Sequence, residues 1–311
     1  MKITIARFTK HYTTQWNEFL GSAKNGLFLF DRSYVEYHED RYTDHSLLIY
    51  RQDKLIALFT ANENEQRIYS HAGLTFGGLL FSKDLKGSDA LQVMESMLQY
   101  YRALGFKEVY YKAIPHIFHQ AACQEDLYAL FRFGATLYRR DISSVIDLKD
   151  PIRFSESKRQ TILKCGQAGV IVQENHDFTA YWELLSMVLA KFGVTPVHTL
   201  KEINLLKETF PSKVRLFEAR LAGDLLAGVV VYDYNNVVHT QYMANSVTGR
   251  TMGALDYINA KLIGEVFSQR KYYSFGISTE NEGTVLNEGL IQQKEMMGGR
   301  AIVYDFYKIS L

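Results

Sequence analysis

The alternation of hydrophobic and polar positions predicts one series of elements in the first half of the chain. The series consists of strands at residues 47–50, 55–60 and 67–72, a helix at 89–104 and a strand at 108–112. The helix is recognisable because Leu91, Met94 and Leu98 recur at three- and four-residue intervals and so share one face. Gly105 follows its last turn and predicts its end.

The second half of the chain repeats this order. Its elements are strands at residues 214–221, 225–232 and 237–244, a helix at 253–268 and a strand at 272–276. Ala222, Gly223 and Asp224 form a hairpin signal between the first two strands. Residues 55–57 align with 225–227, and 70–71 with 240–241, at one offset. Two unrelated hairpins are the alternative, but the shared order of elements favours an internal duplication.

The segment 147–153, which contains Pro151, is the expected joint between two domains, residues 1–150 and 151–311. Beyond the joint the pattern predicts a helix at 156–165, a strand at 170–174 and a helix at 178–192. Thr199 and Glu202 have the spacing of a capping box that opens one more short helix. Helices interleaved with hairpin-rich strands predict an α/β or α+β fold that is built twice.

Composition and charge narrow the class of protein. Of 311 residues, 47% are hydrophobic and 22% are charged, which predicts a folded globule, and the formal charge of +1 argues against a generally basic nucleic-acid-binding protein. The two cysteines, Cys123 and Cys165, form no CxxC motif and suggest reduced thiols. No apolar run approaches the ~20 residues of a membrane span, and the first residues do not resemble a signal peptide, so we expect a cytoplasmic protein.

One group has the spacing of metal ligands. His116, His119 and Cys123 stand at i, i+3 and i+7, which would place them on one helical face. No fourth ligand is evident, so a structural role is the favoured interpretation and no metal is expected.

Two later segments end strands with polar residues. Residues 239–254 run from a strand into a helix, where backbone N–H groups, Gly249, Gly253 and Arg250 could receive an anion such as a pyrophosphate. An ordinary loop is the alternative. In residues 272–300 we single out Glu280, Asn287 and Lys294, whose alternative roles are helix capping and a solvated surface.

The order of these elements, together with four segments of the chain, resembles a known protein family. The order of strands, polar glycine-containing turn and helix is similar to that of GNAT-superfamily acyltransferases, and its duplication resembles the tandem, FemAB-like branch. The matching strings are SHAGLTFGGLLF at 70–81, HTQYMANSVTGRTMGALDY at 239–257, SFGISTENEGTVLNEGLIQQKEMMGGR at 274–300 and AIVYDFYKISL at 301–311. The resemblance covers the whole chain. It implies two tandem GNAT-like domains, each a mixed, largely antiparallel sheet flanked by helices.

The resemblance also implies a donor. GNAT enzymes hold the pyrophosphate of acyl-CoA on a Q/R-x-x-G-x-G/A turn, and Arg250 to Gly253 match its first four positions, whereas Leu255 replaces the final Gly or Ala. FemAB-like proteins use aminoacyl-tRNA and contact it through a lysine near the tail, which Lys294 matches. The donor-binding residues implied in this way are Tyr242, Met243, Ala244, Gly249, Arg250, Gly253, Ala254 and Lys294.

The chemistry implied is acyl transfer to an amine. The strands at 237–244 and 272–276 should part, leaving N–H groups near Tyr242–Ala244 to polarise the donor carbonyl. Glu280 or His239 would accept the amine proton, and Tyr304 or Tyr307 would protonate the leaving group. For His239 a buried hydrogen-bond pair with Gln241 is the alternative, and for the two tyrosines the alternative is packing.

The acceptor would lie between the two domains. Its expected contacts are Arg32, Tyr34, Tyr37, His38, Lys158 and Gln241. The turn at 75–79 has glycines but no basic partner, so the first domain is expected to lack a donor site. The leading hypothesis is an N-acetyltransferase-like enzyme that uses acyl-CoA on a small-molecule or cell-envelope amine. The alternatives are an aminoacyl-tRNA-dependent enzyme acting on a peptidoglycan-type precursor and a non-catalytic binding protein.

Overall fold

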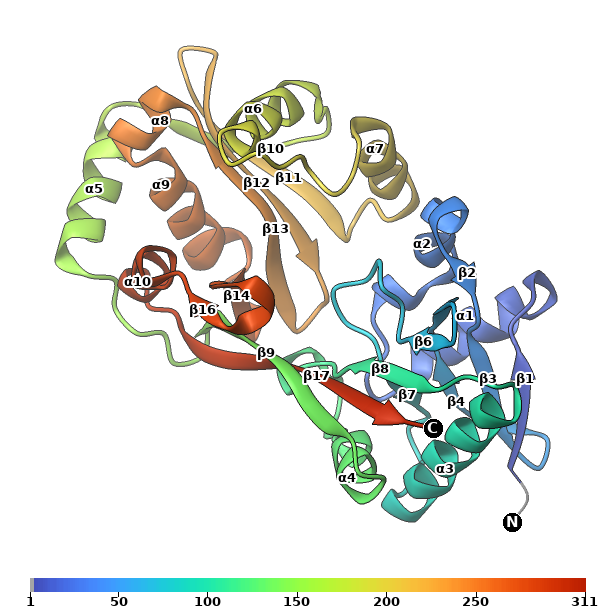
Figure 1. Cartoon of the computed structure of the whole chain (residues 1–311). Coiled ribbons are helices and arrows are strands. Elements are labelled where there is room, and N and C mark those ends of the chain that lie inside the picture. The colour runs from blue at the N-terminus through green and yellow to red at the C-terminus, as the bar shows by residue number, and fades with distance from the viewer. Residues whose placement is uncertain (1–2) are drawn as a thin grey trace. The chain divides into compact units, whose positions relative to one another are not determined.

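The computed structural model describes residues 3–311, which form two compact units (Figure 1). Unit 1 contains the chain up to Asp141 together with residues 281–284 and 303–311, and unit 2 contains residues 142–280 and 285–302. Each unit is therefore assembled from separate segments of the chain. In particular, the C-terminal strand belongs mostly to unit 1, although it follows the last helix of unit 2 in sequence.

Unit 1 holds two groups of strands. Antiparallel strands β1 (Ile3–Arg7), β3 (Leu47–Arg51), β4 (Lys54–Phe59) and β7 (Leu79–Phe81) form a four-stranded sheet in that order. The others are β2 (Thr43–Asp44), β5 (Asn62–Asn64), β6 (Arg67–Tyr69), β8 (Glu108–Lys112) and the end of β17 (Arg300–Ser310). Strand β8 pairs antiparallel with β17 and parallel with β6, so this group is mixed.

The core of unit 1 lies against its longest helix. Its α-helices are α1 (Thr13–Ser22), α2 (Arg32–Val35), α3 (Gly87–Ala103) and α4 (Glu125–Arg132), and its 3₁₀ turns are η1 (Lys10–Tyr12), η2 (Phe28–Phe30), η3 (Glu36–Arg41), η4 (His116–Phe118) and η6 (Asn281–Gly283). The buried face of α3 includes Met94 and Leu98, as the pattern predicts, and packs with Ile49, Phe59 and Val109. Burying such side chains contributes roughly 1.5–3 kcal/mol each.

Unit 2 is built on six strands in the order β10-β11-β12-β13-β14-β9. They are β10 (Ile171–Asn175), β11 (Val214–Leu221), β12 (Asp224–Asp233), β13 (Val237–Asn245), β14 (Tyr272–Ile277) and the second part of β9 (Thr136–Asp147). All neighbours are antiparallel except β13 and β14. Residues 226–233 of β12 are buried throughout, because helices cover both faces of this sheet.

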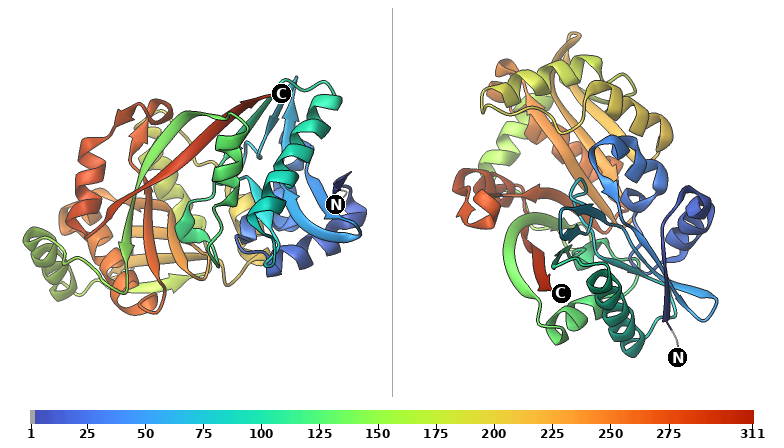
Figure 2. Two further views of the ribbon diagram at one scale, coloured as in Figure 1. Left: turned by 90° about the horizontal axis from the view of Figure 1, so that it is seen from below. Right: turned by 45° about the vertical axis from the view of Figure 1, so that its right-hand side comes forward.

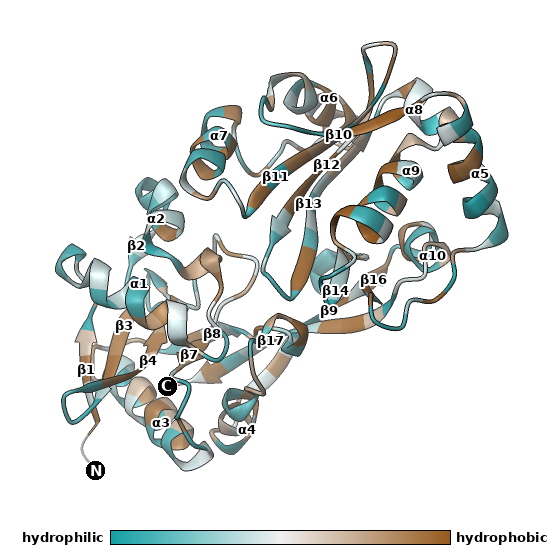
Figure 3. Cartoon of the chain, turned by 180° about the vertical axis from the view of Figure 1, so that it is seen from behind, coloured by the Kyte–Doolittle hydropathy of each residue, from teal (hydrophilic) through white to brown (hydrophobic). Residues whose placement is uncertain are grey.

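The helices of unit 2 divide between the two faces of its sheet (Figure 2). They are α5 (Glu156–Gln167), α6 (Thr179–Ala190), α7 (Leu200–Thr209), α8 (Val247–Met252), α9 (Ala254–Lys261), the π-helical turn η5 (Leu262–Val266) and α10 (Glu288–Met296), with a ribbon of β15 (Thr279–Glu280) and β16 (Val285–Leu286). Ile258 and Leu262 pack with Val229 and Val231 on one face. On the other, Tyr181 of α6 packs directly over Gly228, and a Cβ there would lie 2.2 Å from its ring. Brown, hydrophobic segments follow the central strands in Figure 3.

Several local predictions can be compared with these elements. The capping box of Thr199 and Glu202 is confirmed at the start of α7. The helix predicted at 253–268 begins six residues earlier, as α8, and breaks at Gly253 before α9. His119 lies beside η4, where its Nε2 is 3.0 Å from the Ile114 carbonyl oxygen, and Cys123 is buried in the core. Residues 3–311 hold no cluster of side chains suited to a metal ion.

Candidate functional site

The strands β13 and β14 separate partway along their length. Their parallel pairing joins Val237 to Tyr272, Val238 to Tyr273 and His239 to Ser274, and it ends there, although β13 continues to Asn245. Residues 240–245 of β13 are paired with β12 on one side only. The predicted parting of these strands is therefore confirmed, and it begins at His239, slightly before the expected position.

Irregularities on both strands produce the parting. In β13, Tyr242 pairs with Val230 and Thr240 with Val231, so Gln241 is an extra residue in a β-bulge. In β14, the register with β9 shifts between Ser274 and Ile277. Gly276 lies within this second irregularity with φ of 74°, a left-handed conformation that costs other residues roughly 1–2 kcal/mol. Each bulge bends its strand, and the pairing of β13 with β14 ends beside the two bulges; we call this unpaired stretch the gap.

Lys294 of α10 braces the bent end of β14. Its Nζ donates to the carbonyl oxygens of Gly276 (2.9 Å) and Ile277 (2.6 Å) and to Ser278 Oγ (2.9 Å). Only 5% of the side chain is exposed, and burial lowers its pKa to about 8. The residue predicted to contact a donor thus lies at the parting, where its ammonium group binds two backbone carbonyl oxygens of the bent strand.

His239 lies at the last paired position before the gap. Its Nδ1 is 3.1 Å from Ser274 Oγ, and a Cβ on Gly276 would lie 3.2 Å from its Cε1. Burial, and next the charge of Lys294, lower its pKa to about 4, so the ring is neutral at pH 7. The hydrogen-bond partner found is Ser274, whereas the sequence suggested Gln241.

The side chain of Tyr242, on the unpaired part of β13, extends toward helix α6. Its Oη is 2.6 Å from Nδ1 of His198, in the loop before α7, and accepts from the His198 backbone N–H at 3.3 Å. The Trp182 ring of α6 packs edge-on against it at 5.2 Å. Burial raises the pKa of Tyr242 to about 12, so the phenol keeps its proton at neutral pH. Neither His198 nor Trp182 lies within a recognisable sequence motif.

The other residues expected beside Tyr242 are packed. Met243 contacts the core on the α9 face, and Ala244 is buried opposite Gly228. Gly249 lies against the Leu226 backbone, where a Cβ would come 2.0 Å from the carbonyl oxygen. A Cβ on Gly253 would meet Thr161 Cγ2 of α5 at 2.0 Å. Both glycines therefore allow close packing of protein against protein.

The amides of the predicted anion-binding turn are partly used within α8. Gly249 N–H donates to Ser246 Oγ, and Arg250 N–H donates to the Ser246 carbonyl oxygen. Ala254, the first residue of α9, is fully buried. Lys158, expected near the acceptor, forms two 2.7 Å bonds to the carboxylate of Asp256 in the first turn of α9. Arg250 itself is exposed and has no ion-pair partner within residues 3–311.

The remaining catalytic candidates lie in other surroundings. Glu280 is exposed on the β15–β16 ribbon and accepts from Nδ2 of Asn287, which caps α10. Tyr304 and Tyr307 belong to the unit 1 part of β17. Tyr304 packs edge-on against Phe76 at 5.3 Å, and Tyr307 Oη donates to Asp305 at 3.3 Å. These contacts agree with the capping and packing roles considered as alternatives.

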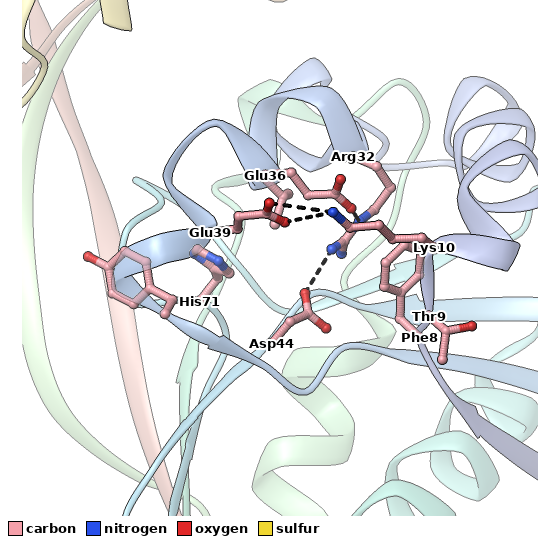
Figure 4. Close-up of a pocket in the computed structure, with 10 residues that line it drawn as sticks. Phe8, Thr9, Lys10, Arg32, Glu36, Glu39, Asp44 and His71 are labelled. Atoms are coloured by element: carbon pink, nitrogen blue, oxygen red, sulfur yellow. Dashed lines mark hydrogen bonds and ion pairs between the residues drawn. The ribbon is translucent and has the colours of Figure 1, made fainter.

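Of the acceptor candidates in unit 1, only Arg32 lines a small pocket of about 190 Å³ (Figure 4). Arg32 is 2% exposed, donates to Glu36 (3.1 Å) and Asp44 (2.9 Å), and lies 3.6 Å over the Phe8 ring. Tyr34 is buried and packs edge-on against Tyr37. The ring of Tyr37 in turn lies 4.1 Å from that of His38, which is also buried. The Arg32 guanidinium is therefore engaged by protein carboxylates.

Comparison with solved structures shows which known fold this chain resembles. No protein-family model matches the sequence, and no curated protein is significantly similar to it. Solved structures are similar over nearly the whole chain. FemX aligns with a TM-score of 0.69 at 10% identity, covering 99% of this chain and 97% of FemX. L-PGS from Bacillus licheniformis aligns at 0.63 with 12% identity, covering 97% and 91%.

A tandem GNAT protein from the clavulanic acid biosynthesis pathway also aligns, with a TM-score of 0.52 at 7% identity and coverage of 99% and 98%. The protein has a tandem GNAT fold of the FemX-like kind. The predicted fold class, a mixed α/β protein with largely antiparallel sheets, is confirmed. No helix within residues 3–311 is long and apolar enough to cross a membrane.

Proposed function

We propose that unit 2 is an acyltransferase site in which the donor carbonyl binds where β13 and β14 part. The observation that carries this proposal is the pairing of the two strands, which stops after His239 and Ser274 between two bulges. Residues 240–245 then present one edge of backbone to the gap without a strand partner. N–H groups fixed in this way stabilise the oxyanion that forms when an amine attacks an acyl group.

The side chains around the gap suit the proton transfers of this reaction. The amine nitrogen forms a bond to the acyl carbon, the bond from that carbon to the leaving oxygen or sulfur breaks, and the amine loses a proton. Tyr242, protonated at neutral pH and bonded to His198, is the donor we assign to the leaving group. His239, neutral and buried beside the gap, remains the candidate acceptor of the amine proton.

Two donor classes fit such a site, and the packing of the α8–α9 turn favours aminoacyl-tRNA over acyl-CoA. In the turn that would hold a pyrophosphate, Gly249 and Gly253 are packed against Leu226 and Thr161. Asp256 also adds a carboxylate to the first turn of α9. This reverses the order expected from the sequence, in which acyl-CoA came first. The fold likeness to FemX, L-PGS and the tandem GNAT protein fits either donor class.

For the acceptor we propose an amine of a cell-envelope precursor, with a small-molecule amine as the alternative. Unit 1 is proposed to lack a donor site, and the counterpart of the gap supports this. There the last parallel pair of β6 and β8 joins Tyr69 to Tyr110, and Ser70 N–H donates to the Tyr110 carbonyl oxygen at 2.8 Å. Lys112 N–H then donates to Ser70 Oγ at 2.7 Å, which keeps these strands together.

The test is a binding and transfer experiment with both donors. Purified protein is titrated with acetyl-CoA and with alanyl-tRNA, and transfer of labelled acetyl or alanyl groups to a peptidoglycan-precursor peptide is followed. We expect binding of the aminoacyl-tRNA and transfer that falls at least ten-fold in Tyr242→Phe, with its KM little changed. The alternative of a non-catalytic binding protein would be established if neither donor bound and no transfer occurred.

A further inference from the structure

A second polar hollow lies on unit 2, between the loop that precedes α5 and the end of α10. Its volume is about 490 Å³, and the polar side chains that line it are those of Arg153, Ser155, Gln292, Glu295 and Arg300. Neither the sequence nor the proposed chemistry assigns these residues a role. Two guanidinium groups and one carboxylate give the lining a net charge of +1.

The two arginines differ from most others in unit 2. Arg159, Arg215, Arg220 and Arg270 each form an ion pair with a carboxylate. Arg153 and Arg300 are exposed and form none within the part of the chain that the structure describes. The third arginine of unit 2 without an ion pair is Arg250 of α8, next to the α8–α9 turn, which the sequence resemblance assigns to the donor and which we call the donor turn. Unpaired arginines thus occur at the donor turn and in the hollow.

The backbone around the hollow is held in place. Ser155 N–H donates to the Met296 carbonyl oxygen at 2.8 Å, joining the two segments that carry the arginines. Gly298, with φ of 84°, packs so closely that a Cβ would lie 2.4 Å from the Ile152 carbonyl oxygen. One arm of Arg300 is oriented by a 2.6 Å bond from Nη1 to the Gly299 carbonyl oxygen. The guanidinium groups therefore project from a fixed frame.

Helix α5 links the hollow to the donor turn. It begins after Ser155 at the hollow, and Thr161 touches Gly253 at the turn between α8 and α9. Six helical residues at 1.5 Å each separate these points by about 9 Å. A donor that carries several phosphate groups can span this distance.

We propose that this hollow binds a phosphate group in the nucleotide part of the donor. The inference rests on the proposed function and extends it to a second contact. Arginine suits phosphate because its planar guanidinium can donate two parallel hydrogen bonds to phosphate oxygens. The phosphate is either a backbone phosphate of tRNA or the 3′-phosphate of coenzyme A, and both carry the same chemistry.

The experiment compares the double variant Arg153→Gln/Arg300→Gln with wild type. One arm measures binding of an alanyl-minihelix RNA across a salt series, and the other compares acetyl-CoA with its analogue lacking the 3′-phosphate. Arg102→Gln/Arg132→Gln, which removes two exposed arginines from unit 1, is the charge-matched control. Glu295→Gln removes the opposing carboxylate, and circular dichroism checks the folding of every variant.

We expect the double variant to weaken binding at least ten-fold in one arm, with Glu295→Gln strengthening it and the control unchanged. In the RNA arm the log–log salt slope should fall by about 1 to 2. A loss confined to 3′-phosphorylated acetyl-CoA assigns the site to coenzyme A. Wild-type affinity in both arms overturns the inference. If the double variant binds both donors like wild type but Arg250→Gln weakens donor binding, the proposed function stands and only this inference fails. If wild type binds neither donor, the inference and the proposed function both fail.

Discussion

Gly276 has a backbone conformation and surroundings that other residues tolerate poorly. Its φ of 74° lies in the left-handed region, and a Cβ would press against the His239 ring at 3.2 Å. The residue bends β14 and determines the position of a candidate catalytic group. A strand followed by glycine is a visible signal in the sequence, but the sign of φ is set by the register shift against β9, which tertiary pairing alone determines.

Gly276→Ala should therefore lower both stability and activity. We expect a loss of roughly 1–2 kcal/mol in the free energy of unfolding and a fall in kcat, because His239 must shift. Urea unfolding and transfer kinetics measure the two effects. Gly264→Ala is the control, since a Cβ there has open space and should leave both values near those of wild type. Equal behaviour of the two variants would show that the bend does not depend on glycine.

Asp126 in unit 1 makes stability depend on pH. It is buried and accepts from Tyr111 Oη at 2.7 Å, and desolvation raises its pKa from 3.8 to about 6. The folded state therefore holds this proton more tightly than the unfolded chain. The contribution of Asp126 to the free energy of unfolding should fall as the pH rises from 3.8 to 6, by at most about 3 kcal/mol, and stay constant above.

The measurement is the difference in unfolding free energy between wild type and Asp126→Asn across this pH range. Subtracting the variant cancels the titration of other groups. We expect the difference to change in the direction given above. A flat profile for Asp126→Asn would mean that this carboxyl titrates normally.

At the scale of elements, α10 keeps β14 bent through one side chain. Lys294→Met would remove three hydrogen bonds and leave the carbonyl oxygens of Gly276 and Ile277 without that donor. We expect a loss of roughly 1–3 kcal/mol and a large fall in transfer rate. Lys261→Met, which removes an exposed ion pair with Glu265, should cost no more than about 0.5 kcal/mol. Thermal unfolding and transfer kinetics of both variants show whether Lys294 acts by holding β14 in its bent form or only by contributing a positive charge.

A second link between elements joins the loop before α7 to β13. The 2.6 Å contact between His198 and Tyr242 predicts that the two side chains act together. In a double-mutant cycle, His198→Ala and Tyr242→Phe should lower kcat by similar factors, and the double variant should be little worse than either. The pH profile of kcat should change in each. Independent, additive losses would separate the two residues and remove the proton-donor assignment.

The sequence predicted most of these elements because their apolar periodicity is local. The buried face of α3 and the capping box of α7 depend only on residues within a few turns. The site was predicted less completely. The polar run around Glu280 drew attention as chemistry, yet its carboxylate bonds to the cap of α10. His198 was missed because its contact with Tyr242 joins residues 44 positions apart, and no local pattern encodes such a pair.

At the scale of the molecule, the sequence order of the elements differs from their grouping in space. Unit 1 includes the end of β17, where residues 306–310 pair with β8 and Ile309 enters the core of that unit. A cut at the proline-containing joint would leave unit 1 without this strand. The duplication inferred from the sequence concerns only the order of the elements. The placement of the C-terminal strand in unit 1 depends instead on the pairing of β17 with β8, whose residues lie nearly 200 positions apart.

A fragment of residues 1–150 should therefore fold poorly. We expect a broad, weakly cooperative thermal transition, and partial recovery when a peptide of residues 300–311 is added, because the peptide restores the strand beside β8. A peptide in which Ile309 is replaced by Asp is the matched control. Cooperative unfolding of the fragment alone would show that unit 1 does not need β17.

The central claim is that the donor carbonyl binds to backbone N–H groups where β13 and β14 part. The most direct measurement is a crystal structure with a non-hydrolysable aminoacyl-tRNA mimic or with acetyl-CoA. The account predicts the donor carbonyl oxygen within hydrogen-bond distance of a backbone N–H in residues 241–244, next to Tyr242. A donor bound elsewhere, or a gap between these strands that closes in its presence, would contradict it.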